Sequence, residues 1–286
     1  MARPPSLPGL GAPESRLSAL GHGLRVYGLI AWMWVRSTLA YRTSFVLMTF
    51  GNFAASGLDF VTIRLMFSRV HALGGFTLPE VAFLYGTCSL ALGLADLLVG
   101  TLGRLGARIR DGTLDTLLLR PAPVYAQITA DRFALRRLGR TGQGLLVLLW
   151  STAQLDVVWT PGRILMVPLM TVCGTAIFGA VYTAGAAFQF WAQDAAELQN
   201  SLTYGGNTLL QYPPTVFARD LVRGVTFIVP LAFVNWLPAL WLLGRPYPLG
   251  LPGWTAFLGP AVAALMVAGA ALAWRHGVRA YRSTGS

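Results

Sequence analysis

Three ionisable residues inside apolar segments are the first candidates for chemistry: Asp59, Arg64 and Asp96. A charge in such a segment is costly to bury, so it is by default a candidate for lining a pathway. At 1.5 Å per helical residue, Arg64 and Asp59 lie about 5 and 12 Å from the outer end of one segment, and Asp96 about 10 Å from the inner end of the next. Two interpretations stay open: these side chains line a pathway, or they snorkel and hydrogen-bond within a bundle.

Enzymatic chemistry finds little support in the remaining residue types. The histidines, His22, His71 and His276, are far apart in the sequence, which predicts neither a catalytic cluster nor a metal site. Cys88 and Cys173 are isolated within apolar segments and have no metal-ligand spacing. The sequence also contains no Lys, so it cannot form the GxxxxGK[ST] loop that binds nucleotide phosphates. We therefore predict no catalytic residue and no metal ligand.

A short charged stretch, "IRDGTLDTLLLRPAP" (109–123), separates two apolar segments. Asp111 is a suitable N-cap, and Asp115 and Arg120 carry the charges that a helix dipole favours at its start and end. Pro121 prevents continuation. The pattern predicts a helix of about two turns whose apolar face is formed by Leu114, Leu117 and Leu118. From the residues alone, this face could rest on lipid, on the protein's own bundle or in a partner's groove.

The composition places these features in a membrane protein. The chain is 55% hydrophobic and 12% charged, about half the charged fraction of a soluble domain. A helix needs about 20 mostly apolar residues to cross a bilayer. Six segments meet this requirement: 44–67, 80–103, 137–156, 164–190, 224–243 and 254–274.

The orientation of these spans follows from the arginines, because Arg-rich loops stay on the cytoplasmic side. Most arginines lie before the first span, between the second and third, and after the sixth, which predicts that both termini are cytoplasmic. The same rule assigns Arg219 and Arg223 to a cytoplasmic loop between spans four and five, so that position 219 should be labelled from the same side as position 110, and position 250 from the other.

The N-terminal region divides into two parts. Residues 1–23 are rich in Pro and Gly and predict a mobile cytoplasmic tail. Residues 24–43 interleave Leu, Trp and Tyr with Arg, which is typical of a helix lying in the headgroup region. The alternative is a seventh span, which would bury Arg36 deep in the bilayer. Residues 44–286 then form the six-span domain.

Three motifs in order carry a family resemblance: "IRDGTLDTLLLRPAP" (109–123), "TFIVPLAFVNWLPALWLLG" (226–244) and "WRHGVRAYRSTGS" (274–286). Together they resemble the ABC-2 type permeases of the DUF990 group, from about residue 24 to the end. The resemblance implies an all-α integral membrane fold with six transmembrane helices, an N-terminal interfacial amphipathic helix and a short cytoplasmic coupling helix between spans two and three.

The resemblance also implies that the short helix contacts a cytoplasmic ABC ATPase. Its motif is matched at Gly112, Thr113, Leu114, Asp115, Leu118, Leu119, Arg120 and Pro121. With Asp111 and Leu117 of the same helix, these residues form the predicted ATPase-coupling set, in which Leu114, Leu117 and Leu118 fill a groove of the ATPase and Asp115 or Arg120 makes charged contacts at its rim.

The resulting functional hypothesis is the permease subunit of an ATP-driven exporter in a bacterial inner membrane. The expected substrate is amphiphilic, drug-like or lipid-like, and the expected partners are an ATPase chain and a second permease, identical or related. ATP and Mg would bind that ATPase; no cofactor on this chain and no nucleic acid are expected. Two alternatives stay open, an ion-coupled secondary transporter and a membrane-embedded lipid-modifying enzyme, although no catalytic constellation supports the latter.

Overall fold

A computed structural model describes residues 16–192 and 195–281 of the chain. Most of the predicted N-terminal tail, residues 1–15 with Arg3, lies outside the described residues, and so does Arg282. The first helix begins at Arg16, within the segment expected to be a tail, and ends at Ala40, close to the expected end of the amphipathic helix at residue 43.

The regular elements of the described residues are helices, apart from an isolated bridge between Leu73 and Phe76. The long ones are α1 (Arg16–Ala40), α2 (Arg42–Phe67), α3 (Leu78–Val99), α7 (Leu138–Gln154), α8 (Pro161–Phe188) and α13 (Gly259–Ala280). The short α-helices are α4 (Leu105–Arg110), α5 (Thr113–Leu118), α6 (Val124–Ala130), α9 (Ala196–Asn200), α10 (Gly206–Leu210), α11 (Arg219–Arg223) and α12 (Trp236–Leu243). The 3-10 helices are η1 (Gly100–Arg104), η2 (Leu135–Arg137), η4 (Pro214–Val216), η6 (Leu231–Phe233), η7 (Pro248–Gly250) and η8 (Gly253–Leu258), and the π-helical turns are η3 (Ser201–Gly205) and η5 (Gly224–Ile228).

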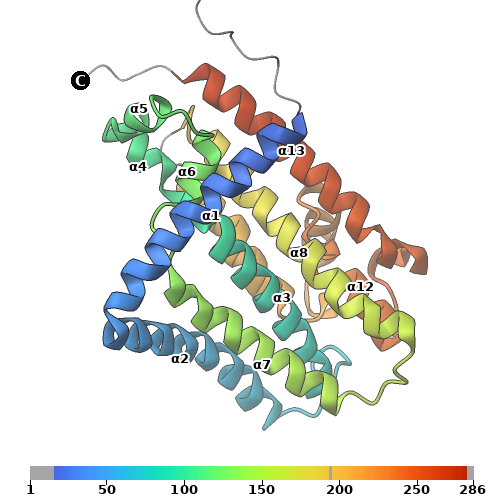
Figure 1. Cartoon of the computed structure of the whole chain (residues 1–286). Coiled ribbons are helices and arrows are strands. Elements are labelled where there is room, and N and C mark those ends of the chain that lie inside the picture. The colour runs from blue at the N-terminus through green and yellow to red at the C-terminus, as the bar shows by residue number, and fades with distance from the viewer. Residues whose placement is uncertain (1–15, 193–194, 282–286) are drawn as a thin grey trace, which may run out of the picture.

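The chain runs back and forth between two ends of a helical bundle (Figure 1). One end, which we call the arginine-rich end, carries α4, α5 and the last turn of α13; Tyr281 after α13 hydrogen-bonds Asp115 of α5. The other, which we call the opposite end, carries residues 68–77 and 211–258. There Thr215 donates to the Gly74 carbonyl at 2.8 Å, and Arg245 donates to both carboxylate oxygens of Glu80 at 2.8 Å.

Four helices of the described residues are long and apolar enough to cross a membrane: Arg42–Phe67, Leu78–Arg110, Pro161–Phe188 and Gly253–Ala280. They coincide with four of the six expected spans. The expected third span, 137–156, contains α7, which has 17 residues and is shorter than the other four. An all-helical membrane protein is therefore confirmed, whereas the number of six spans stays a prediction.

The expected fifth span, 224–243, is wrong as a continuous helix. The segment is divided into η5, η6 and α12, with Pro230 and Asn235 at the breaks. Proline lacks the backbone donor that a continuous helix needs. The chain instead crosses the bundle for the fifth time in the contiguous turns α9, η3 and α10, residues 196–210, which we call the fifth run.

Polar side chains explain why hydropathy did not predict the fifth run as a membrane span. Gln199 is buried, and its Oε1 accepts a hydrogen bond from Gln189 Nε2 at 3.1 Å. Asn207 is also buried, with its Oδ1 3.1 Å from Cys88 Sγ. Both residues satisfy part of their hydrogen-bonding capacity inside the protein, so a polar segment is tolerated in the bundle.

The fifth run changes the placement of Arg219 and Arg223. Both residues belong to α11, which follows the fifth run and the Thr215–Gly74 contact, and both lie at the opposite end. The expectation that they share a side with Arg110 is wrong, because the arginine rule was applied to a loop bounded by a misplaced span.

Cysteine labelling checks this arrangement. Arg219→Cys and Arg69→Cys should react with a membrane-impermeant maleimide from the same side of the membrane, and Arg110→Cys from the other side. The native Cys88 and Cys173 are buried and should give little background. Reaction of positions 110 and 219 from one side would contradict the placement of the fifth run.

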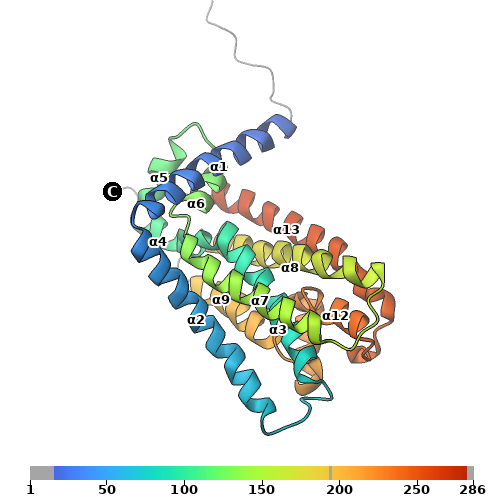
Figure 2. The ribbon, with the colours of Figure 1, turned by 60° about the horizontal axis from the view of Figure 1, so that its bottom comes forward.

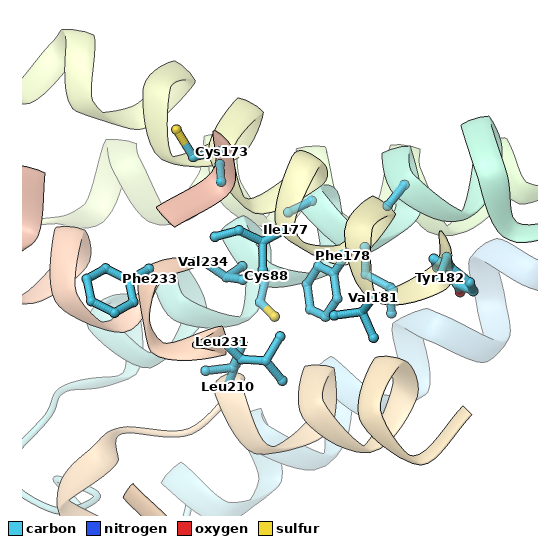
Figure 3. Packing of buried hydrophobic residues seen from close by; sticks show 14 of the residues in the cluster. Cys88, Cys173, Ile177, Phe178, Val181, Tyr182, Leu210, Leu231, Phe233 and Val234 are labelled. Atoms are coloured by element: carbon cyan, nitrogen blue, oxygen red, sulfur yellow. The ribbon is translucent and has the colours of Figure 1, made fainter. Parts of the chain in front are cut away.

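The core lies where α3, α8, the fifth run and the segment 229–243 meet. Figure 3 shows Ile177 and Phe178 of α8 facing Cys88 of α3, with Leu210 and Leu231 beside them. All of these side chains are almost fully buried. The segment 229–243 is thus part of the packed interior of the protein.

The first two long helices, α1 and α2, pack less closely on the bundle than the others do. α1 and α2 form a V that opens toward the bundle (Figure 1). Figure 2 shows α1 over the arginine-rich end, where it packs on α6. The Tyr27 hydroxyl donates to the Leu98 carbonyl at 3.0 Å, and its ring meets Phe133 edge to face. Most side chains of α2 are exposed, so α2 is a peripheral helix.

Candidate functional site

The predicted coupling helix is one arm of a helical hairpin formed by α4 and α5. Gly112 joins the arms in a left-handed conformation, φ +66°, which glycine adopts without the steric cost of a side chain. Gly112 rather than Asp111 occupies the N-cap position of α5, and Asp111 is the C-cap of α4. The expected N-cap role of Asp111 is therefore wrong. The helix is also shorter than expected, since α5 ends at Leu118.

The apolar face of α5 points into the protein. Leu114 is 1% exposed and Leu117 8% exposed, and both belong to the main core. They are not available to fill a partner's groove, which corrects the prediction for these two residues. Leu118 and Leu119, by contrast, are 39% and 87% exposed. The exposed apolar surface of the hairpin therefore lies at the C-terminal end of α5.

Polar contacts attach the hairpin to α6 and to the end of α13. Tyr281 donates to Asp115 Oδ1 at 2.9 Å, and burial raises the pKa of the Tyr281 phenol, so its proton stays in place. Gln127 of α6 donates to the Leu117 carbonyl at 3.1 Å. Arg108 of α4 forms an ion pair with Asp131. A displacement of the hairpin would thus be transmitted to α6 and α13.

The remaining residues of the predicted coupling set lie around this tip. Thr113, Arg120 and Pro121 are exposed, and Thr113 Oγ1 donates to the Arg108 carbonyl at 3.3 Å. Asp115 is half-buried and holds Tyr281, so it serves an internal contact. Asp111 and Arg120 are the exposed charged residues of the set, and Arg120 directly follows Leu119.

A second polar site surrounds Asp96 inside the bundle. Its carboxylate is paired with Arg137 at 3.1 Å and lies 3.3 Å from the Tyr182 hydroxyl. Arg137 also donates to the Asp96 carbonyl at 2.8 Å. Asp96 belongs to α3, Arg137 to η2 and Tyr182 to α8, so one carboxylate joins three elements. This geometry supports the second of the two interpretations of Asp96, hydrogen bonding within the bundle.

The structure does not bring Asp59 and Arg64 together with Asp96. Both lie in the half of α2 toward the opposite end, and both are exposed. Asp96 lies one turn before the end of α3 at the arginine-rich end. The three residues therefore form no common site, and no group of three His, Cys, Asp or Glu side chains within the described parts of the chain could hold a metal ion.

Sequence reasoning missed a polar cluster between α2, α3, α7 and the fifth run. The Tyr85 hydroxyl lies 2.7 Å from the Ser56 carbonyl and 3.2 Å from Gln143 Oε1. Arg140 donates to Ser56 Oγ at 3.4 Å, and its guanidinium stacks over the Tyr204 ring at 5.2 Å. The spacing of Arg140 and Gln143 on one helical face was the available signal. Such a cluster holds polar groups at membrane depth, where they require partners.

The fold and these sites together define a multi-pass helical membrane protein with internally paired charges and a compact hairpin at one end. The family model of the ABC-2 family transporter proteins matches residues 53–285. The chain therefore belongs to the ABC-2 family transporter proteins, which makes it a membrane permease of an ABC transporter and a transport subunit rather than an enzyme. Searches of curated proteins and of solved structures found no significant match.

Proposed function

We propose that this chain is the permease subunit of an ATP-driven exporter and that a separate ABC ATPase docks on the tip of the α4–α5 hairpin. The proposal rests on the family, whose members work with ABC ATPases in general, and on the form of the hairpin. The chain has no Lys and so no P-loop of its own. ATP and Mg would bind the ATPase.

The observation that carries the proposal is the contrast between the two faces of α5. Leu114 and Leu117 anchor the helix in the core, while Leu118 and Leu119 remain exposed at the surface. A transporter must convert movement of its ATPase into movement of its spans. A tip that is apolar outside and fixed to the bundle inside suits this task, and Arg120 adds a charge beside it.

The proposed pathway lies between two permease chains, identical or related, in a bacterial inner membrane with both termini cytoplasmic. α2 supports this arrangement, since it is peripheral and exposes large apolar side chains, among them Leu47, Phe50 and Leu58. We propose an amphiphilic substrate, drug-like or lipid-like, because a pathway between subunits that opens to lipid suits such molecules.

Replacing the exposed leucine at the tip tests the docking proposal. Leu119→Ala should weaken binding of the cognate ATPase at least tenfold, about 1.4 kcal/mol, which is in the range of a buried interface anchor. The variant should fold normally because Leu119 makes little contact with its own chain. Binding is measured by titrating the detergent-solubilised permease with labelled ATPase, and substrate-stimulated ATP hydrolysis should fall in parallel.

A matched leucine provides the control. Leu221 of α11 is exposed at the opposite end, so Leu221→Ala should leave ATPase binding unchanged. Leu114→Ala should instead destabilise the permease itself, by about 2–5 kcal/mol, because it removes core volume. Normal ATPase binding and normal transport by Leu119→Ala would refute docking at this tip.

A further inference from the structure

A cavity of about 570 Å³ lies in the elbow between α1 and α2 and is closed on its third side by residues 132–136, which lead into α7. Its walls include the hydroxyl groups of Ser37, Thr38 and Ser44 and the ring of Trp34. Ser44 lies in the first turn of α2, which is one of the candidate membrane spans. The cavity therefore opens at the level where lipid headgroups meet the end of that span.

Two arginines, Arg132 and Arg136, line this cavity, and its lining contains no carboxylate. The neighbouring arginines have internal partners: Arg108 is paired with Asp131, and Arg137 with Asp96. The side chains of Arg132 and Arg136 form no ion pair or hydrogen bond with residues 16–192 or 195–281. Two positive charges thus converge on one space, which favours an anionic ligand.

The backbone conformation of Arg132 also indicates a binding site. Arg132 has φ +53°, a left-handed conformation that is uncommon for a residue other than Gly, Asn or Asp. Glycine would relax this position, and the arginine side chain forms no compensating hydrogen bond or ion pair within the described chain. Strain retained at a residue with a free functional group is a recognised sign of a site. Trp34 adds a buried indole N–H that has no acceptor among the described residues.

A second cavity, of about 360 Å³, continues from the first along α2. The two share Met48 and Arg136, and the second passes Gly51, Asn52 and Ala55, whose small side chains leave an open, shallow groove on the surface of the helix. Its direction is from the start of the span toward the middle of the membrane. The combination is a cationic, hydroxyl-lined cavity at headgroup level joined to a shallow groove at the depth of the acyl chains.

We propose that this double cavity binds one anionic glycerophospholipid of the surrounding bilayer. Arg132 and Arg136 hold the phosphate, the hydroxyls of Ser37, Thr38 and Ser44 surround the headgroup, and one acyl chain lies along α2 past Gly51 and Ala55. The lipid would connect α1 and α2 to the segment that precedes α7, three parts of the chain that line a common space there. The inference does not depend on the substrate or on ATPase docking.

Native mass spectrometry of the full-length permease tests this proposal. The protein is purified from vesicles of phosphatidylcholine with phosphatidylglycerol, and the lipids that survive mild detergent are counted. We expect one phosphatidylglycerol per chain and selective loss of phosphatidylcholine. Arg132→Gly and Arg136→Ala should each weaken retention about fivefold, from the usual contribution of one basic residue at a membrane surface. Glycine is chosen at position 132 because it accepts the left-handed backbone, and thermal unfolding confirms that the variant is folded.

The control is Arg279→Ala, which removes an exposed charge from α13 at the same end without touching the cavity, and which should leave retention unchanged. Equal retention of phosphatidylcholine, or equal loss in the Arg279 variant, would overturn the proposal. A further arm adds glycerol 3-phosphate at millimolar concentration. Displacement of the lipid by this soluble anion would show that the site selects free phosphate esters, which also overturns a lipid site; persistence of the lipid supports it.

Discussion

Replacing Asp96 by alanine should destabilise the protein by about 3–5 kcal/mol, the usual effect of removing one partner of a buried ion pair. The change leaves the Arg137 guanidinium inside the bundle without its carboxylate and deprives Tyr182 of its acceptor. Because Asp96 joins α3 to η2 and α8, the loss should affect unfolding of the whole bundle. Thermal or denaturant unfolding of the purified protein in one detergent measures it.

Two comparisons separate this effect from simple loss of charge. Asp220→Ala breaks the ion pair between Asp220 and Arg223, in which the side chain of Asp220 is 90% exposed and that of Arg223 58% exposed. Loss of such a surface pair should cost at most about 1 kcal/mol. The double variant Asp96→Ala with Arg137→Ala should lose less than the sum of the single variants, since no unpaired charge remains. Equal effects of Asp96→Ala and Asp220→Ala would contradict a structural role for the Asp96 ion pair.

A second large effect is expected at the contact between α3 and α7. A Cβ atom at Gly144 would lie 2.8 Å from the Leu90 backbone nitrogen, and one at Gly86 would lie 2.7 Å from the Leu148 nitrogen. Both distances are too short for a carbon atom, and backbone cannot move aside as a flexible side chain does. Gly144→Leu should therefore cost about 3 kcal/mol, at the upper end of overpacking, because it forces the helices apart.

The same helix supplies the control for this prediction. Gly142 lies two residues away and has no atom within 4 Å of the position of an added Cβ. Gly142→Ala should stabilise the protein by about 0.4–1 kcal/mol, because alanine loses less conformational entropy in a helix. Opposite signs at positions 142 and 144 in one unfolding assay would confirm the close approach, whereas equal signs would show that α3 and α7 are not this close.

The sequence predicted the parts of the fold that depend on length and hydrophobicity. The spans at 44–67, 80–103, 164–190 and 254–274 each correspond to a long apolar helix. It failed at 224–243, because an apolar segment buried inside a protein reads like one buried in lipid. It also missed the fifth run, in which Gln199 and Asn207 are paired within the bundle. Hydropathy cannot tell an apolar segment buried in protein from one buried in lipid. It also cannot show that a polar side chain has a hydrogen-bond partner inside the bundle, because that partner lies elsewhere in the sequence.

The candidate site was predictable to a similar extent. The charged stretch 109–123 and its proline stop indicated a short helix, and this helix is present. Which of its leucines are buried depends on where the helix lies on the bundle, and helical spacing alone gave Leu114, Leu117 and Leu118 equal weight. The ion pair of Asp96 with Arg137 joins residues 41 apart, a contact that local patterns do not encode.

The fifth run also has a consequence for the lipid around the protein. Residues 196–210 rise about 22 Å at 1.5 Å per residue, whereas the hydrocarbon layer is about 30 Å thick. The segment 229–243 makes up the difference at the opposite end, where irregular backbone is tolerated because protein surrounds it. Asn235 attaches this segment to α3 and α10, because its side chain donates to the Leu84 and Leu210 carbonyls at 3.0 Å. On this flank, the fifth run therefore spans about three quarters of the hydrocarbon layer and the folded segment fills the remainder, so we expect the hydrophobic mismatch of the short run to be met by protein and not by thinning of the bilayer.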